Sequence, residues 1–458
     1  MSNLFYRLRK TQSIFDFKEL ENNEIYFANS TELNDPMEGY KNLIFNGDKI
    51  VWENLFKHFL RCLELSYQNY LINNEESFIH YCSEQIPVFI KVNEFQTPIY
   101  KKLFTDIWSD AFNMYGSVID KIVGRTTPVT KEELSFYLQG FNTIALSVIH
   151  KHYQLNLIVP KSNEYNYDHT KVIESIKNLI DTHEKNINRE NFDKVFLLLS
   201  QVSAQSRDQL FLELKSNGKD KSKSKKLHLL NFAKYYLKSI EKLTYPDVYT
   251  ASFMGEDAIH NSSVWGHYGD SHKGVCLIFK ADNSGSLTFS NAKIGHSSQG
   301  VILGNTKLKF EQIKYEQDYP EIDFFRSLGR LPTGQILSDW HINDNGISTI
   351  HNEVFNNESV WREAYWNKFK SNNLVKMKDW GYEKEHRLVL NSGMDEAHRK
   401  LKYEFNSLHG IIFGINTKEE DKLKIIDIIE SKCSQYERGE FKIYQAYHCN
   451  FKKNIQFI

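Results

Sequence analysis

SVWGHYGDSHKGVCLIF, residues 263–279, contains a cluster of polar and aromatic residues directly before an apolar run. The run GVCLIF is predicted to be a strand, because a short, continuous apolar segment bounded by turn residues is typical of a strand that is buried on both faces. The clustered residues that precede this strand are Trp265, His267, Tyr268, Asp270, His272 and Lys273. They could form an aromatic and imidazole platform for a flat ring, with Lys273 near an anionic group, or a hydrogen-bonded turn. A metal site with His267, Asp270 and His272 as ligands is a third interpretation.

The strip FYRLR, residues 5–9, has the two-residue period of a strand. This period puts Phe5, Arg7 and Arg9 on one face and Tyr6 and Leu8 on the other. Two arginines two residues apart can bind the oxygens of a phosphate or a carboxylate. The plainer interpretation is an edge strand with solvated arginines.

A third strip, WGYEKEHRLVL at residues 380–390, places two acids at the start of a predicted strand. Glu383 and Glu385 fall on one face, and Arg387 continues that face. Two acids so close repel one another unless a cation or a hydroxyl-bearing ligand lies between them, and a carboxylate in a cleft can stabilise a developing cation. Simple pairing with arginines of neighbouring strands fits the spacing equally well.

The rest of the chain predicts an α+β protein with a mixed or antiparallel sheet core. Residues 5–9, 13–21 and 24–29 read as strand, helix and strand, and the turn residues Asn34, Asp35 and Pro36 then end the regular structure. Helical spacing such as Phe192, Val195, Phe196 and Leu199 predicts a large all-helical insertion, and strand patterns return after Pro246. The predicted parts are therefore 1–48, 49–245 and 246–458, the first and last forming the core. We interpret the lysine-rich segment 216–226 as a solvated loop, with a docking patch for an acidic partner or nucleic acid as the alternative.

The composition excludes several classes of protein. The 458 residues suggest two or three domains, and 57 basic against 58 acidic residues leave no net charge to bind a polyanion. The five cysteines form no CxxC pair, which argues against a disulfide framework. Sequence fingerprints of P-loop proteins, dinucleotide-binding Rossmann folds, zinc proteases and α/β-hydrolases are missing. Without an apolar leader or a run of about 20 apolar residues, we expect a cytoplasmic protein with no membrane contact.

Together the strips resemble a bacterial family known as domain of unknown function 2971. Its members typically show a LYKYR-like start, an FNDP-like turn, an MWAHYADSHKG-like strip and a WxYEKEWR-like strip. The matching strips here are FYRLR, EIYFANSTELNDPMEGY, VWGHYGDSHKGVCLIF, KYE, KDWGYEKEHRLVL and GIIFG, within residues 4–40 and 248–452. The chain departs from the pattern at Leu8, Val264 and His386, none of which replaces a strongly polar position.

More distantly, the order of the strips is similar to that of ADP-ribosyltransferases, although a strict S-T-S strip is lacking. This resemblance implies that NAD is consumed as a substrate and that no metal is needed. It implies that Glu385 stabilises the oxocarbenium-like centre as nicotinamide leaves, that Glu383 orients the attacking group, and that His267 or Tyr268 supports the nicotinamide ring. The candidate residues for binding NAD are Tyr6, Arg7, Arg9, Asn34, Asp35, Trp265, Tyr268, His272, Lys273 and Arg387.

We therefore expect an NAD-consuming protein that modifies a macromolecule, either protein or nucleic acid, or hydrolyses NAD. A bacterial toxin or antiphage-defence effector is the expected setting, with the helical insertion contacting the target or a partner protein. Two alternatives stay open. One is a metal-dependent nuclease or hydrolase built on His267, Asp270, His272 and the two glutamates, and the other is a non-enzymatic sensor or adaptor that binds a nucleotide or a phage protein.

Overall fold

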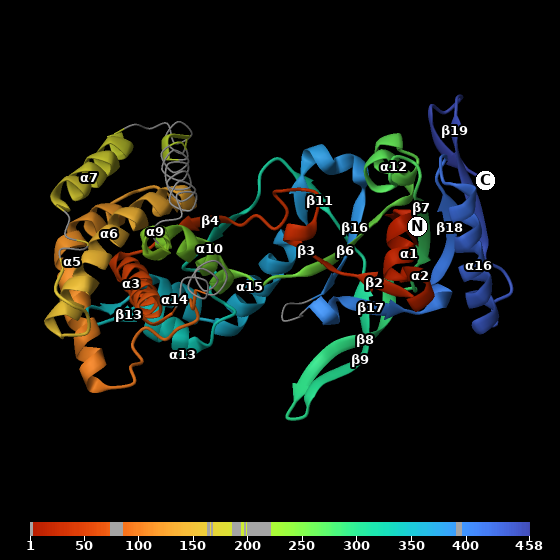
Figure 1. Cartoon of the computed structure of the whole chain (residues 1–458). Helices are drawn as coiled ribbons and strands as arrows, with labels where there is room; N and C mark the ends of the chain where they lie inside the picture. Colours follow the sequence, from red (N-terminus) through yellow and green to blue (C-terminus); the bar gives the residue numbers. More distant parts are fainter. Residues whose placement is uncertain are drawn as a thin grey trace. The chain divides into compact units, whose positions relative to one another are not determined.

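The structure is a computed structural model that describes residues 3–73, 86–162, 165, 168–185, 194–196, 198, 221–390 and 396–458. Internal contacts group the chain into two units, each described here by itself (Figure 1). The sheet unit consists of Met1–Tyr40, Pro246–Pro320 and Lys368–Ile458, and the helical unit of Lys41–Tyr245 and Glu321–Asn367. The division into 1–48, 49–245 and 246–458 stays a prediction. Phe192, Leu199 and residues 216–220 of the lysine-rich segment lie outside the described residues. Residues 221–226 of that segment begin helix α9 (Lys221–Leu230), so the predicted loop is wrong there.

Antiparallel pairing organises the sheet unit. In the described part of the chain, its largest sheet has nine strands in the order β10-β16-β6-β1-β7-β18-β19-β20, with β3 also paired to β6. Only β18 and β19 are parallel neighbours in this sheet. The strands are β1 (Leu4–Arg9), β3 (Ala28–Asn29), β6 (Tyr249–Met254), β7 (Val275–Lys280), β10 (Glu311–Gln312), β16 (Glu385–Leu390), β18 (Leu408–Phe413), β19 (Lys442–Cys449) and β20 (Asn454–Phe457).

The remaining elements of the sheet unit form two smaller sheets and several short helices. The order β2-β17-β8-β9 describes one sheet, and β11 pairs with β15 in parallel. These strands are β2 (Glu24–Tyr26), β8 (Ser286–Ser297), β9 (Gly300–Lys309), β11 (Lys314–Glu316), β15 (Val375–Met377) and β17 (Lys400–Tyr403). The helices are α1 (Thr11–Phe17), α2 (Glu19–Asn22), η1 (Ser30–Glu32), α11 (Glu256–Ile259), α12 (Ser262–Tyr268), η3 (Lys378–Glu383), η4 (Glu396–Arg399), η5 (Phe405–Ser407) and α16 (Glu419–Gln435).

The large sheet is buried on both faces, which explains the uninterrupted apolar run in β7. Leu277 and Phe279 belong to the hydrophobic cluster on one face, whereas Cys276 and Ile278 belong to the cluster on the other. Because successive side chains of a strand point to opposite faces, both sets must be apolar. The second cluster also contains Trp265 of α12, so this helix covers part of the sheet.

One edge of strand β6 pairs with two different strands, β1 at one end and β3 at the other, so the sheet forks along this edge. Along its opposite edge β6 pairs with β16 over its whole length. Along the forked edge, Met254 pairs with Tyr6 of β1, whereas Thr250 pairs with Ala28 of β3. Between these two contacts the side chain of Arg7 reaches across and donates to the carbonyl oxygen of Ser252 at 3.4 Å. The fork opens the space in which the candidate site lies.

The helical unit is built on long helices with polar N-caps. The side chains of Asp48, Thr97 and Thr130 accept hydrogen bonds from the first backbone N–H groups of α3, α5 and α6. The helices are α3 (Lys49–Ile72), α5 (Pro98–Val123), α6 (Lys131–Leu155), α7 (Thr170–Lys185), α9 (Lys221–Leu230), α10 (Phe232–Thr244), α13 (Thr333–Ile336), η2 (Leu337–His341) and α14 (Thr349–Phe355), with α15 (Glu358–Asn372) crossing the boundary between the units. Short strands accompany them: β4 (Asn42–Phe45), β5 (Val129–Thr130), β12 (Glu321–Asp323), β13 (Ile342–Asn343) and β14 (Gly346–Ile347).

One buried acid in this unit gives a prediction about stability. Asp339 is 2% exposed, and its Oδ1 accepts from the backbone N–H of Val92 at 3.2 Å. Burial raises the pKa of Asp339 from 3.8 to about 6, so the folded state holds this proton more tightly than the unfolded state does. The free energy of unfolding therefore falls as pH rises from about 4 to about 6, and the loss persists at pH 7. We expect Asp339→Asn to raise the free energy of unfolding at pH 7 by about 2 kcal/mol, measured by urea unfolding. A gain of the same size at pH 4 and at pH 7 would contradict this origin.

The α+β class with mixed and antiparallel sheets is confirmed. The predicted strand–helix–strand start corresponds to β1, α1 with α2, and β2, and the strand predicted in the strip at 380–390 corresponds to β16. Among the described helices, none combines the length and apolar composition that crossing a membrane requires.

Candidate functional site

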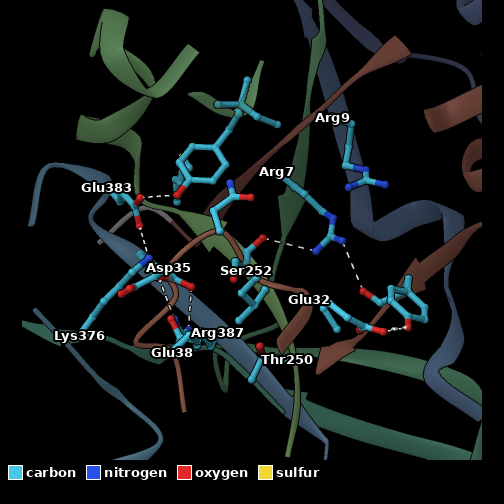
Figure 2. Close-up of a pocket in the computed structure, with 18 of the residues that line it drawn as sticks. Arg7, Arg9, Glu32, Asp35, Glu38, Thr250, Ser252, Lys376, Glu383 and Arg387 are labelled. Carbon is cyan, nitrogen blue, oxygen red and sulfur yellow. Dashed lines mark hydrogen bonds and ion pairs between the residues drawn. The ribbon is translucent and has the colours of Figure 1, made fainter. Parts of the chain in front are cut away.

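A pocket of about 300 Å³ lies at the fork between β1 and β6 (Figure 2). This volume is at the lower end of the range usual for small-molecule sites. Its walls come from β1, from the turn after η1, from alternate residues of β6 and β16, and from α12, β15 and η3. The residues that line it are Tyr6, Arg7, Leu8, Arg9, Tyr26, Ala28, Glu32, Leu33, Asn34, Asp35, Glu38, Thr250, Ser252, Met254, Tyr268, Lys376, Glu383, Glu385 and Arg387.

Glu383 and Glu385, the two acids of the strip at 380–390 and here called the E-x-E strip, both contact the ammonium group of Lys376. Nζ of Lys376 donates to Oε2 of Glu383 at 2.8 Å and to Oε2 of Glu385 at 3.3 Å. The side chains of all three residues are at most 7% exposed. A cation therefore lies between the acids, as their spacing requires, and it comes from the chain itself.

Arg387 holds Glu385 from the other side. Its Nε donates to Oε1 of Glu385 at 2.7 Å and its Nη2 to Oε2 at 3.1 Å, a two-point grip on one carboxylate. The same Nη2 donates to Oε2 of Glu38 at 2.9 Å. Glu38 and Glu385 together raise the pKa of Arg387, although burial acts in the opposite direction. The network thus runs from Glu383 through Lys376, Glu385 and Arg387 to Glu38.

The two glutamates differ in protonation behaviour. Burial alone would raise the pKa of Glu385, but the guanidinium of Arg387, helped by Lys376, lowers it to about 2. For Glu383 burial prevails over the attraction of Lys376, and its pKa is raised above the usual value. The site therefore combines a carboxylate that is held ionised with one that takes up a proton more readily.

Two tyrosines fix these acids in place. The hydroxyl of Tyr268 donates to Oε1 of Glu383, and burial together with this carboxylate raises the pKa of Tyr268, so the hydroxyl keeps its proton. The hydroxyl oxygen of Tyr315 accepts the backbone N–H of Glu385 at 2.8 Å. Tyr315 belongs to β11, whose parallel pairing with β15 also positions Lys376.

The two arginines of β1 have different surroundings. Nε of Arg9 donates to Oε2 of Glu19 at 2.8 Å, so its charge is neutralised within the chain. Arg7 is 9% exposed and lies over the ring of Phe253. Among the described residues, its guanidinium donates only to the carbonyl oxygens of Ser252 and Tyr26, at 3.4 and 3.5 Å. Burial and the charge of Arg9 lower the pKa of Arg7 to about 10. Among the described residues, no carboxylate forms an ion pair with Arg7.

The predicted turn at residues 34–36 also reaches the pocket. Asn34 and Asp35 both line it. Oδ1 of Asp35 accepts a hydrogen bond from the backbone N–H of Met37 at 2.9 Å. This side-chain-to-backbone turn spans Pro36 and is typical of aspartate. Oδ2 of Asp35 is buried and has no hydrogen-bond partner in the described part of the chain. Among the described residues, the pocket thus offers a buried cation without an acid partner and a buried acceptor without a hydrogen bond.

Four candidates from the strip at 263–279 lie outside the pocket lining. Trp265 is fully buried and donates its indole N–H to the carbonyl oxygen of Ile259 at 2.8 Å. His267 is exposed, and its ring faces that of Tyr382 edge-on at 6.3 Å. His272 and Lys273 belong to the turn that leads into β7.

This turn has an unusual backbone. Asp270, Ser271 and His272 have φ angles of 51°, 53° and 68°, in the left-handed region that residues other than glycine rarely adopt in succession. The backbone N–H of Asn416 donates to the carbonyl oxygen of His272 at 2.9 Å. None of these three residues lines the pocket, and the backbone contacts are those of a hydrogen-bonded turn.

Sequence reasoning missed Lys376 and Glu38, which complete the network. Lys376 precedes Glu385 by nine residues, and no local period links them, because the contact depends on β15 lying beside β11. Glu38 follows the Asp-Pro turn and approaches Arg387 from 349 residues away in the sequence. The sequence signal that could have predicted this contact was an acid shortly after the turn, Glu38, together with an arginine on the E-x-E strand, Arg387.

Within the described ranges, no group of three His, Cys, Asp or Glu side chains is arranged to hold a metal ion. The metal-dependent alternative therefore stays a hypothesis without a ligand set among these residues. The position between the two glutamates is taken by Lys376.

The fold and the pocket define an α+β protein with a charged site at a forked sheet. Comparison with protein families adds that the model of a family described as "Protein of unknown function (DUF2971)" matches residues 264–388. This match supports the family resemblance over α12, β7 and the strip with Lys376, Glu383, Glu385 and Arg387. No curated protein and no solved structure matches the chain.

Proposed function

We propose that this chain consumes NAD, as an ADP-ribosyltransferase acting on a macromolecule or as an NAD glycohydrolase, and that its sheet unit is a core of ADP-ribosyltransferase type. One observation carries the proposal. Arg7, a buried cation without an acid partner among the described residues, lines the same pocket as Glu385, a carboxylate held ionised. They come from β1 and β16, the strands on either side of β6. In a ligand that carries an anionic group and a centre that becomes cationic during reaction, Arg7 would bind the anion and Glu385 would stabilise the cationic centre.

The reaction breaks the bond between C1′ of the ribose and the nicotinamide nitrogen, and the bonding electron pair leaves with nicotinamide. The positive charge that develops on the ribose is stabilised by the carboxylate of Glu385, which Arg387 keeps ionised at neutral pH. A hydroxyl of the target, or water, then forms the new bond to C1′. Its proton goes to Glu383, whose pKa is raised by burial.

The pyrophosphate of NAD is the anionic group that Arg7 would bind. Tyr268 takes the position beside the nicotinamide ring, because it reaches the pocket from α12 whereas His267 does not line it. Asp35, through its unused Oδ2, would accept a hydrogen bond from a hydroxyl or an amide of the ligand. In this proposal the helical unit selects the target or a partner protein, in a toxin or an antiphage-defence system of the cytoplasm.

The test is to incubate the purified full chain with NAD and to measure the release of nicotinamide. We expect release, and NAD labelled in the adenine ring distinguishes transfer, which leaves label on protein or nucleic acid, from hydrolysis, which leaves free ADP-ribose. Release that continues in EDTA supports the proposal, whereas cleavage of nucleic acid that EDTA abolishes would favour the metal-dependent alternative. Unchanged NAD with every target offered would contradict the proposal.

A specific observation also favours the non-enzymatic alternative. The side chains of Glu383 and Glu385 are 2% and 3% exposed, and Tyr268, Lys376 and Arg387 already bind their oxygens. Such a closed network is also what a purely structural support of a nucleotide-binding pocket requires. Saturable binding of NAD without release of nicotinamide would support a sensor or adaptor.

A further inference from the structure

A second pocket, of about 520 Å³, lies in the sheet unit where α2, β17 and α16 meet. Its walls come from residues 21–23 at the end of α2, from 402–406 and from the last turn of α16 with Tyr436. Helices α2 and α16 contact one another next to it (Figure 1). None of the residues that line the first pocket lines this one.

Three polar atoms in the wall of this pocket are buried without a partner among the described residues. They are Oε2 of Glu21, Oδ1 of Asn23 and the hydroxyl oxygen of Tyr403. Tyr403 is 4% exposed and Asn23 is 5% exposed, so both side chains are held in the wall. A buried polar atom without a hydrogen bond is costly, and three of them around one hollow indicate that something outside the fold satisfies them. Two of the three are acceptors only, so the occupant must donate hydrogen bonds.

The same pocket carries two cations that act on one another. Lys402 of β17 and Lys432 of α16 both line it. Burial lowers the pKa of Lys432, and the charge of Lys402 lowers it further, while Glu21 acts in the opposite direction. Two ammonium groups in this position are both stabilised when an anion lies between them.

An exposed aromatic ring completes the wall. The ring of Tyr436 is stacked on that of Phe405 at 5.3 Å, and Asn23 holds its hydroxyl through a hydrogen bond of 3.1 Å. Tyr436 is 42% exposed, and Nζ of Lys432 lies over its ring, 5.8 Å from the centroid. A flat ligand can stack on this ring once the ammonium of Lys432 moves onto an anionic group of the same ligand.

We propose that this second pocket binds a nucleoside monophosphate. The base stacks on Tyr436 and donates an exocyclic amino hydrogen to Glu21 and Asn23, and the phosphate binds Lys402 and Lys432. The hydroxyl of Tyr403 donates to the ligand. This site is independent of the proposed reaction, because it shares no lining residue with the first pocket.

The experiment is calorimetric titration of the full chain with AMP, adenosine and inorganic phosphate. We expect AMP to bind, and adenosine and phosphate to bind at least about tenfold more weakly, because each lacks half of the contacts. Lys432→Ala should weaken the binding of AMP at least about tenfold. Lys424→Ala is the matched control, since Lys424 lies on the same helix outside the pocket, and it should leave the binding of AMP unchanged.

A second variant separates binding from folding. Tyr403→Phe removes only the hydroxyl, which has no hydrogen-bond partner among the described residues. We therefore expect weaker binding of AMP with an unchanged or higher melting temperature. Because AMP could also enter the first pocket, Arg7→Met is titrated in parallel. Binding that survives Arg7→Met and is lost in Lys432→Ala supports the proposal. Binding lost in Arg7→Met but kept in Lys432→Ala, or no saturable binding of AMP at millimolar concentrations, would overturn it.

Discussion

Replacing Glu385 by glutamine is expected to lower the rate of nicotinamide release at least about 100-fold, with binding of NAD changed by only a few-fold. Glutamine has nearly the same shape and still accepts hydrogen bonds, but it lacks the negative charge that would stabilise the developing cation. The effect should therefore fall on kcat, with little change in KM. The measurement is the rate of nicotinamide release at saturating and limiting NAD, with the melting temperature of each variant measured in parallel.

Stability needs a matched control, because Glu385→Gln also leaves Lys376 and Arg387 undercompensated in a buried network. Glu38→Gln removes a different carboxylate from the same Arg387 and leaves Glu385 in place. We expect both variants to lose stability and only Glu385→Gln to lose most of its turnover. A Glu385→Gln protein that is folded and releases nicotinamide at the wild-type rate would remove Glu385 from the reaction. If the wild type binds NAD but releases no nicotinamide, the sensor alternative stands.

The parts of the site that follow local periods could be predicted from the sequence. Alternation correctly grouped Glu385 with Arg387 and identified β1 as a strand that carries two arginines, and nine of the candidate residues line one pocket. What alternation could not decide was which of the two arginines forms an ion pair within the chain. That depends on Glu19, which lies on α2 and pairs with Arg9.

Contacts that depend on the pairing of distant strands could not be predicted. Lys376 reaches the two glutamates because β15 lies parallel to β11, and no spacing within the strip at 380–390 encodes this. The strip at 263–279 shows the opposite case, since its residue types suggested a site but His272 and Lys273, at and after the left-handed turn at 270–272, do not line the pocket. Chemical crowding in a sequence indicates a site only when the backbone between the residues is regular enough to set their directions.

The presence of Lys376 between the glutamates changes how the E-x-E strip works in the proposed reaction. In its absence two buried acids at this spacing would repel, and the proton that one of them retained would neutralise part of the site. Lys376 and Arg387 allow Glu385 to stay charged while Glu383 keeps a raised pKa. The division of roles between the two acids therefore comes from the cations around them and not from the E-x-E pattern alone.

Arg7→Met is expected to weaken the binding of NAD about 10- to 100-fold and, at the same time, to leave the protein at least as stable as the wild type. The loss of binding corresponds to the roughly 1.5–3 kcal/mol of a hydrogen bond to a charged group. The stability should not fall, because methionine keeps the packing against Phe253 while the cost of burying an unpaired cation disappears. The measurements are a calorimetric titration with NAD and urea unfolding without ligand.

Arg9→Met is the control on the same strand and the same face. Arg9 is paired with Glu19, so its removal leaves a carboxylate that is only 10% exposed without its partner, and stability should fall. Its effect on the binding of NAD should be smaller, because the charge of Arg9 is already neutralised within the chain. A residue that serves the fold loses stability when it is replaced, whereas a residue held for a ligand loses binding. If Arg7→Met instead showed lower stability and unchanged binding, Arg7 would not bind the pyrophosphate of NAD, and the proposed function would lose the observation that carries it.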